Sequence, residues 1–472
     1  MTMSLEQPRR VAALAAALSL LTLWLLVPPF SSDLGGFWLR KTELVRLLPL
    51  LLVAWLHPRA LLFRWHWLDA PVVLYCSAPC LAAVLNGLSR SFALWEAIKE
   101  FEYWFIPYWL GRSLFVDEQA RQLLARVLIW SGVAYLPLVW LEIWQGPFWT
   151  ECLTGETVGR QVRGADRDGS FRPSVFLDSG FVLTMHLGLA CLAAIASCGF
   201  GSCGGLRAAL AALFSRVFRR GRHGTLGECQ DAGNSRETLR EFRSMGSWYK
   251  FRYEMVAALV LAASVLASRS LGSIVLLTIG CSWLALFRWG DRRTLLARGV
   301  LLGLVCVPAS YMAVRLSGWL TEQAVHDAAA LFTTPQKADS LAFRLRAEEQ
   351  VFQAMQGHWW WGWGSFHGWL QSGDRIFLDG FWPFTLTRTG MVTVVAWLAM
   401  VMLPILTLII RQPVVAPAEK DWSLWTFALF LALSLIDSQF NYFGAAPQML
   451  LVGAMTAQAA KLWSPQAVAE RA

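Results

Sequence analysis

The chain has 472 residues, of which 56% are hydrophobic and 15% charged, and its mean hydropathy is +0.45. This composition excludes a set of soluble domains and indicates a polytopic membrane protein. The formal net charge of +9 does not point to nucleic acid, because cytoplasmic loops of membrane proteins are enriched in Lys and Arg. The nine cysteines have no metal-ligand spacing, so we expect no disulfide framework, metal or cofactor.

Apolar runs recur along the whole sequence, and a membrane-spanning helix needs roughly 20 mostly apolar residues. They predict an all-α fold of about twelve transmembrane helices with both termini in the cytoplasm. The expected spans in residues 1–145 are 11–29, 44–56, 68–87, 101–115 and 127–145. Those in 146–314 are 175–199, 253–268, 270–288 and 295–314, and those in 389–472 are 389–410, 422–440 and 445–462.

Two long segments separate these spans. Residues 201–250 are rich in arginine and form a basic cytoplasmic loop, whereas residues 315–388 form a large external loop that carries short helices. With this alternation, nearly every arginine-rich short loop lies on one side of the membrane, as the positive-inside bias requires.

One stretch, residues 342–390, concentrates arginines, carboxylates, histidines and tryptophans beside a predicted span. Such a concentration indicates a polar ligand. Indole rings stack on sugars and also populate the membrane interface, so Trp363 and Trp382 fit either a substrate contact or an interfacial belt. Gly362 and Gly364 predict a tight backbone turn in this stretch.

Six arginines are predicted on the external side, against the charge bias: Arg172, Arg269, Arg344, Arg346, Arg375 and Arg388. A guanidinium presents a planar fork of donors that suits phosphate oxygens. Several of them in one external pocket would suit a diphosphate at the headgroup level. The alternative is a snorkelling side chain or a local ion pair, and for Arg344 the partner would be Glu348, one helical turn further on.

The same loop contains candidate bases: His358, His367, Asp374 and Asp379. Transfer of a sugar from a lipid diphosphate requires a group that accepts the proton of the attacking hydroxyl, and a carboxylate or imidazole does this. Asp379 is favoured because Pro383 and the start of the next span should fix its position.

Residues 160–410 resemble the bacterial O-antigen ligase/polymerase superfamily. That family has an arginine that opens a helix, followed by a proline and Gly-x-Gly, and then by His-Asn-x-aromatic, a leucine and a glycine. The corresponding residues here are Arg344, Trp359, Gly362-Trp363-Gly364, Asp379-Gly380-Phe381-Trp382, Leu386 and Gly390. Ser268-Arg269 resembles the Ser-Arg-Gly of the family, and Arg172 resembles the arginine that precedes a further span.

The resemblance implies an inverting, metal-independent glycosyltransferase of the GT-C type in the bacterial inner membrane. It would act at the periplasmic face on undecaprenyl-diphosphate-linked glycan, with a glycan or lipid acceptor. Membrane lipids and polysaccharide assembly or export machinery are the other expected partners, and nucleic acid is not.

The resemblance also assigns roles to residues. Arg172, Arg269 and Arg344 would hold the diphosphate, and Asp379 would be the base at a position where the ligases carry histidine. We therefore expect Asp379, Arg344 and Arg269 to be catalytic. Residues expected to contact the substrate are Arg172, Arg346, His367, Trp363 and Trp382.

Several alternatives stay open. The aspartate at position 379 fits a polymerase or exopolysaccharide-assembly relative better than a ligase, and His367 is the other candidate base. A flippase or transporter of lipid-linked oligosaccharide is the alternative function, although no inverted repeat is apparent in the sequence. A non-catalytic scaffold would leave the external arginines unexplained.

Overall fold

The computed structural model describes residues 6–26, 31–34, 37–146, 173, 175, 177, 179–200, 252–268, 270–288, 291–331, 335–364, 380–413, 421–441 and 446–463. Its α-helices are α1 (Glu6–Leu26), α2 (Lys41–Leu56), α3 (Ala70–Leu85), α4 (Arg90–Glu100), α5 (Ile106–Leu114), α6 (Glu118–Gln145), α8 (Gly180–Phe200), a helix over 252–267, α11 (Leu271–Arg288), α12 (Asp291–Leu316), α13 (Glu322–Ala330), α14 (Pro335–Ala354), α16 (Phe381–Arg411), α17 (Trp422–Asp437) and α18 (Ala446–Lys461). Short helical turns are η1 (Pro58–Leu61), η2 (Trp67–Asp69) and the π-helical turn η3 (Phe101–Phe105).

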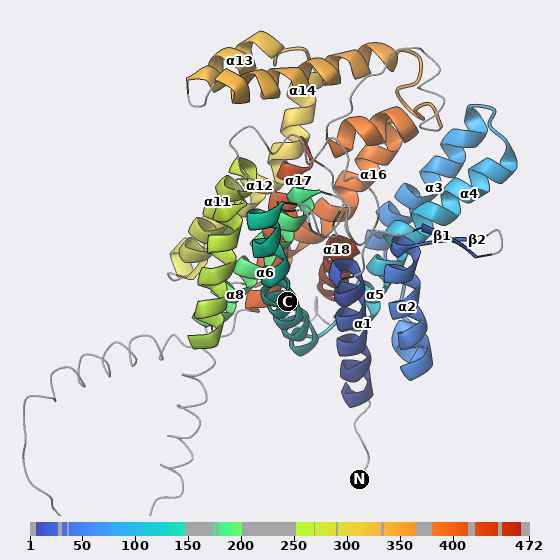
Figure 1. The fold of residues 1–472 in the computed structure, drawn as a ribbon. Helices are drawn as coiled ribbons and strands as arrows, with labels where there is room; N and C mark the ends of the chain where they lie inside the picture. Colours follow the sequence, from blue (N-terminus) through green and yellow to red (C-terminus); the bar gives the residue numbers. More distant parts are fainter. Residues whose placement is uncertain are drawn as a thin grey trace, which may run out of the picture.

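The prediction of an all-α fold is confirmed in the described part of the chain (Figure 1). The one sheet there is a short antiparallel hairpin of β1 (Ser31–Leu34) and β2 (Phe37–Arg40), in which Ser31 lies opposite Arg40. This hairpin connects α1 to α2.

Five of the described helices are long and apolar enough to cross a membrane: Trp67–Leu85, Glu118–Gln145, Gly180–Cys198, Thr294–Leu316 and Phe381–Arg411. They coincide with five of the predicted spans, which indicates a membrane protein. Three shorter apolar helices are Leu44–Leu56, Leu271–Phe287 and Trp422–Asp437. A total of about twelve spans stays a prediction.

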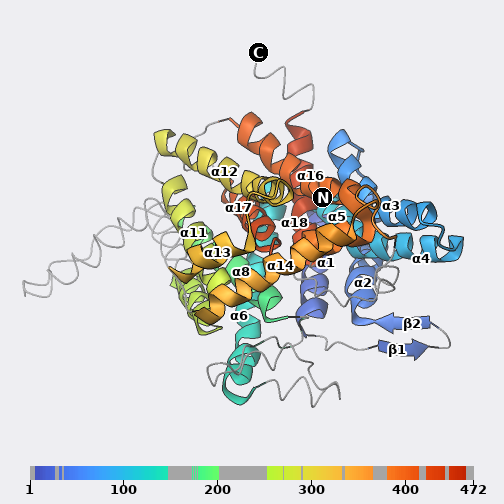
Figure 2. The same ribbon diagram turned by 90° about the horizontal axis from the view of Figure 1, so that it is seen from above.

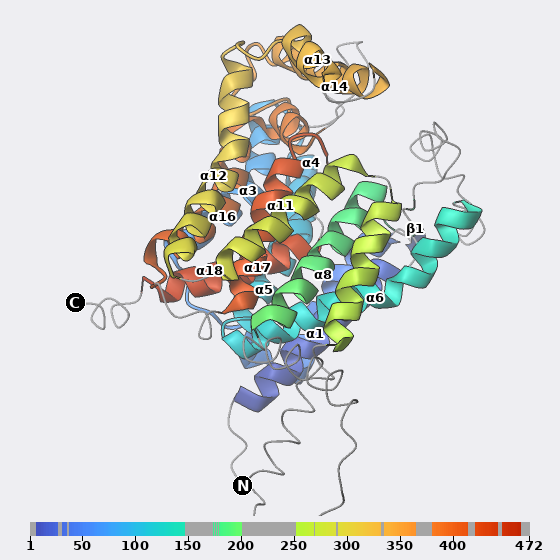
Figure 3. The same cartoon turned by 90° about the vertical axis from the view of Figure 1, so that its left-hand side faces the viewer.

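The faces of the helices fit this setting. On α12, Leu301 and Val305 are fully buried, whereas Leu295 and Leu296 are exposed, as expected for a helix with one face toward lipid. By contrast, α17 is buried from Trp422 to Leu435. A helix that is apolar all round lies in the interior, and Figure 3 shows α17 between α12 and α8.

Helices α13 and α14 lie across one end of the bundle (Figures 1 and 3), and the view from above shows them crossing over the other helices (Figure 2). Both belong to the segment predicted as the external loop. The chain leaves α14 through the tryptophan-rich turn, residues 355–364, whose last residues contact α16.

Two predicted span boundaries are corrected. Helix α16 begins at Phe381 rather than at 389, and it contains a break at Gly390, where φ is 80° and ψ is −179°. Residues 101–115, predicted as one span, belong to a longer helical run over 90–114 that consists of α4, the π-helical turn η3 and α5 without a break. The π-helical turn is a bulge inside this run, and the membrane-spanning role of the run stays a prediction.

Candidate functional site

The tryptophan-rich turn docks into the break of α16. The backbone N–H groups of Trp363 and Gly364 donate to the carbonyl oxygens of Thr387 and Arg388, both at 2.9 Å. In the opposite direction, the N–H of Met391 donates to the carbonyl of Trp359 at 2.8 Å. A broken helix leaves backbone groups without partners, and in an apolar environment these groups must bond elsewhere. The turn supplies those partners.

Glycine makes this contact geometrically feasible. Gly362 has φ of +60°, and a Cβ atom there would lie 2.6 Å from the carbonyl carbon of Arg388. Asn86, just after α3, donates its side-chain amide to the carbonyls of Gly362 at 3.1 Å and Ala82 at 2.8 Å. Three segments far apart in the sequence therefore meet here: the end of α3, the turn and α16.

Arg388 projects from α16 just before the break and forms ion pairs with two carboxylates of α4. Its Nη1 bonds Oε1 of Glu100 at 2.5 Å, and its Nη2 bonds Oε2 of Glu96. Lys99 also bonds Glu96. The side chains of Glu96 and Glu100 are only 6% and 8% exposed, so Arg388 neutralises carboxylates that would be costly to bury alone.

The electrostatics of Glu96 follow from this arrangement. Burial acts to raise the pKa of the Glu96 carboxyl, but the charges and hydrogen bonds of Arg388 and Lys99 act in the opposite direction. The net result is a pKa below the ordinary glutamate value, so Glu96 is ionised at neutral pH.

A cavity of about 440 Å³ opens beside these ion pairs, between α3, α4, η3 and the first part of α16. Its lining combines charged groups with aromatic rings: Tyr75, Phe92, Trp95, Glu96, Lys99, Glu100, Tyr103, Trp104, Phe381, Phe384 and Arg388. Ligand sites in proteins are of about this size, roughly 300–1,000 Å³. We refer to it below as the aromatic–carboxylate cavity.

A second buried ion pair ties α14 to α12. The Nε of Arg315 donates to Oε2 of Glu348 at 2.8 Å, and the hydroxyl of Tyr311 donates to the same carboxylate at 3.0 Å. Arg315 also donates to the carbonyl of Leu345 at 3.0 Å. Burial raises the pKa of the Glu348 carboxyl above its ordinary value, although Arg315 acts to lower it. This pair holds α14 on the end of the bundle.

The structure places four of the predicted site residues. Arg344 is half-buried on α14, and its predicted partner Glu348 bonds Arg315 and Tyr311. Arg346 is exposed on α14, and its Nε donates to Glu322 of α13 at 3.0 Å.

The two predicted tryptophans differ in position. Trp363 is half-buried, and its ring stacks on His358 with 3.9 Å between ring centroids and an interplanar angle of 19°. Trp382 is fully buried and lies 5.6 Å from the ring of Phe352, centroid to centroid. Its faces are covered by protein, so this position does not support a direct stack on a sugar. The remaining predicted residues lie outside the described residues: Arg172, Arg269, His367 and Asp379, together with Asp374 and Arg375.

Sequence reasoning missed three members of the two ion-pair groups: Glu96 and Glu100, which pair with Arg388, and Arg315, which pairs with Glu348. Glu96 and Glu100 lie four residues apart and therefore on one face of a helix. Two carboxylates on one face, next to an apolar segment, were the signal in the sequence that a cation pairs with them. Arg315 is a charge at the end of an apolar helix, which is costly there unless it is paired.

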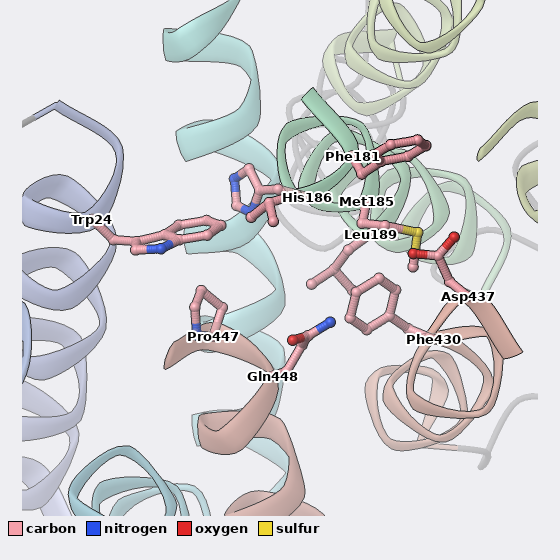
Figure 4. Close-up of a pocket in the computed structure, with 10 residues that line it drawn as sticks. Trp24, Phe181, Met185, His186, Leu189, Phe430, Asp437, Pro447 and Gln448 are labelled. Carbon is pink, nitrogen blue, oxygen red and sulfur yellow. The ribbon is translucent and has the colours of Figure 1, made fainter. Parts of the chain in front are cut away.

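A smaller cavity of about 20 Å³ lies between α1, α8, α17 and α18 (Figure 4). Trp24, His186 and Gln448 lie around it. The Nε2 of His186 is 3.3 Å from Oγ of Ser131, and its ring meets Trp24 edge-on with 5.2 Å between centroids. A volume of this size holds about one water molecule. It is too small for a sugar.

Within the described ranges, no group of three or more His, Cys, Asp or Glu residues is arranged to hold a metal ion. No protein-family model matches this chain, and no curated protein matches its sequence.

Proposed function

We propose that this chain is a membrane glycosyltransferase that transfers or polymerises polyprenyl-diphosphate-linked glycan at the periplasmic face of a bacterial inner membrane. One observation carries the proposal. The described part of the stretch with the family-like motifs packs onto the same end of the helical bundle as two buried ion-pair groups, Arg388 with Glu96 and Glu100, and Arg315 with Glu348. Charged residues within membrane helices are costly, and they mark functional sites.

The backbone around the proposed base supports its role. Asp379 lies outside the described residues, but its neighbour Gly380 is held against the end of α17. The N–H of Phe381 donates to the carbonyl of Ser438 at 2.9 Å. A Cβ atom at Gly380 would lie 2.5 Å from the carbonyl oxygen of Gln439. A general base must be held in position relative to its substrate, and the close packing of Gly380, the next residue in the sequence, is the observation that supports Asp379 for this role.

The charges at the two ends of the bundle support the proposed orientation. At the end away from α14, Arg298 donates to the carbonyl of Gln412 at 2.8 Å, and Arg121 bonds Asp421 at 2.6 Å. Arg112 bonds Asp69 at 3.0 Å near the start of α3. Arginines gathered at one end favour the cytoplasm for that end, which supports the proposal that α13 and α14 face the periplasm.

The proposed reaction is a direct displacement. The acceptor hydroxyl attacks the anomeric carbon, a new glycosidic C–O bond forms, and the bond to the diphosphate oxygen breaks with inversion. Asp379 accepts the hydroxyl proton, and the polyprenyl diphosphate leaves with the bonding electrons. Arg344, with Arg172 and Arg269, would stabilise the negative charge of the leaving diphosphate.

The test is turnover of a polyprenyl-diphosphate-linked oligosaccharide by purified protein in EDTA. We expect wild-type protein to transfer or extend the glycan, and Arg344→Ala, Arg269→Ala and Asp379→Asn to lose most of that activity while staying folded. Gln350→Ala serves as the control for Arg344→Ala, because Gln350 is exposed on the same helix, α14, and has no role in the proposed site. Activity that survives Asp379→Asn but is lost in His367→Ala would move the base to His367.

The break in α16 favours a second candidate function, a flippase or transporter of lipid-linked oligosaccharide. Discontinuous membrane helices form the substrate and ion sites of many transporters. Reconstitution in proteoliposomes separates the two functions: movement of the lipid-linked glycan across the bilayer without any new glycosidic bond would replace the transferase with the flippase.

A further inference from the structure

We propose that the aromatic–carboxylate cavity binds an uncharged sugar unit of the glycan, and that the diphosphate binds elsewhere. This inference rests on the proposed function, because it identifies the part of the substrate that this cavity holds.

The first argument is the charge balance of the cavity. Glu96 and Glu100 contribute two negative charges, and Arg388 and Lys99 contribute two positive charges, so the formal charges of the lining sum to zero. Arg388 bonds both carboxylates. A diphosphate that approached Arg388 would have to lie beside two carboxylates, and a divalent cation would have to lie beside the guanidinium. Each arrangement places like charges together. An uncharged ligand avoids both.

The second argument is the set of hydrogen-bonding groups. An ionised carboxylate accepts about four hydrogen bonds, whereas Glu96 accepts bonds from Arg388 and Lys99 and Glu100 accepts one from Arg388. Both carboxylates therefore retain acceptor positions, and both residues line the cavity. Sugar hydroxyls are donors that fit such positions, and bonds to charged acceptors are stronger than bonds between neutral groups.

The third argument is the aromatic wall. Tyr75 and Trp104 meet with 4.8 Å between ring centroids, and Trp104 lies 5.5 Å from Phe381, so these rings form a packed floor. Trp95 is 56% exposed, and Phe384 is half-buried. Their ring faces can receive the apolar face of a sugar ring.

Arg388 also connects the cavity to the docked turn. Its side chain lines the cavity, while its backbone carbonyl accepts the bond from Gly364. A sugar bound beside Glu96 would therefore lie next to the segment that joins α14, with Arg344, to α16.

The experiment measures binding to purified full-length protein by isothermal titration. The probes are neutral trisaccharides of glucose, galactose, mannose and rhamnose, a galacturonic acid trisaccharide, and inorganic pyrophosphate. We expect at least one neutral trisaccharide to bind more tightly than the galacturonic acid trisaccharide. We expect Trp95→Ala to weaken that binding roughly three- to tenfold, the loss of one aromatic contact, and Glu96→Gln to weaken it as well.

Leu94→Ala is the matched control, because Leu94 is 61% exposed on the same helix and does not line the cavity; its affinity should equal that of wild type. Pyrophosphate affinity should not change in Trp95→Ala or Phe384→Leu. Absence of binding by every neutral sugar, or equal binding by Trp95→Ala and wild type, would overturn the proposal. So would pyrophosphate binding that depends on Trp95 or Phe384.

These readouts separate this inference from the proposed function. Sugar binding that depends on Trp95, in a protein that forms no glycosidic bond, would keep the subsite and remove the transferase. Turnover with an unchanged KM in Trp95→Ala would keep the transferase and remove the subsite.

Discussion

A Cβ atom on Gly390 would lie 2.2 Å from the carbonyl oxygen of Trp360, well inside van der Waals contact. Only glycine therefore allows the tryptophan-rich turn to lie against the break of α16. The contact depends on the backbone of both segments, and φ of +80° at Gly390 is a conformation that other residues rarely adopt.

Gly390→Ala should consequently destabilise the protein. The substitution places a side chain at a positive φ, which costs more than about 1 kcal/mol, and adds the collision with Trp360. We expect a lower midpoint of thermal unfolding in detergent and faster hydrogen exchange at the amides of Trp363 and Gly364. Gly303→Ala is the control, because Gly303 on α12 faces open space. Equal unfolding midpoints for the two variants would contradict the proposed role of the break.

Removal of the Arg388 charge should leave two buried carboxylates without their shared partner, so that Glu96 retains only Lys99 and Glu100 loses the cation that bonds it. Breaking a buried pair costs about 3–5 kcal/mol, and we apply the lower end of that range because Arg388 is 18% exposed. Arg388→Met should therefore lower the free energy of unfolding by about 3 kcal/mol.

A triple variant, Arg388→Met with Glu96→Gln and Glu100→Gln, checks the cause of this loss. It removes the uncompensated charges and should recover much of the stability in chemical unfolding experiments. If the triple variant were less stable than Arg388→Met alone, the loss would come from packing rather than from charge.

Glu348 and Glu349 provide a pair of adjacent carboxylates for a direct comparison. Glu348 is 2% exposed and lies 2.8 Å from Nε of Arg315, whereas Glu349 is 57% exposed and lies 4.0 Å from Nη2 of the same side chain, at the limit of an ion pair. Glu348→Ala should destabilise the packing of α14 by about 3–5 kcal/mol, because Arg315 would stay buried without that partner. Glu349→Ala should have little effect. The rate at which a protease cleaves α14 in the folded protein would distinguish the two variants. Equal cleavage rates would contradict the role of the Arg315–Glu348 ion pair in holding α14 on the bundle.

His326 should make the contact between α13 and α14 depend on pH. Its ring nitrogens lie 3.4 Å from Asp327 and 3.2 Å from Asp339, and hydrogen bonds to these carboxylates raise the pKa of His326. Asp327 belongs to α13 itself, whereas Asp339 belongs to α14, so the part of the raised pKa that comes from Asp339 means that the protonated form is favoured when the helices pair. The stabilisation that His326 gives to the contact between α13 and α14 is thus complete below the ordinary histidine pKa of about 6.5. It is lost as the pH rises through the pKa that His326 has in the folded protein.

Hydrogen exchange over residues 322–330 measures this effect. We expect faster exchange at about pH 8 than at about pH 5.5, after correction for intrinsic rates, and no such difference in His326→Ala. His358→Ala is the control, since His358 stacks on Trp363 and does not belong to α13. A pH dependence that persisted in His326→Ala would assign it to another group.

Much of the fold could be predicted from local patterns. Long apolar runs place the membrane helices, since length and hydropathy are properties of a single segment. The tight turn predicted at Gly362 and Gly364 is also confirmed, with φ of +60° and +72°. Both features depend on residues that are neighbours in the sequence.

The partners of the site could not be predicted in this way. Arg388 is 292 residues from Glu96, and no periodicity within either segment relates them. The start of α16 is not evident from the sequence because Thr385, Thr387 and Arg388 are polar, although the two threonine side chains bond backbone carbonyls within the helix. Polar residues of this kind tolerate burial once their bonds are made.

The ion pairs of Arg388 also have a consequence for how the chain is made. The ribosome synthesises Glu96 and Glu100 almost 300 residues before Arg388. During that interval α4 has two carboxylates without this cation, and an isolated carboxylate is poorly tolerated in lipid. We therefore expect helix α4 to settle into the bundle late, after α16 has been inserted. Nascent chains that stop before residue 388 should leave α4 accessible to water-soluble labels, even though the apolar helices α3 and α6 have already been made.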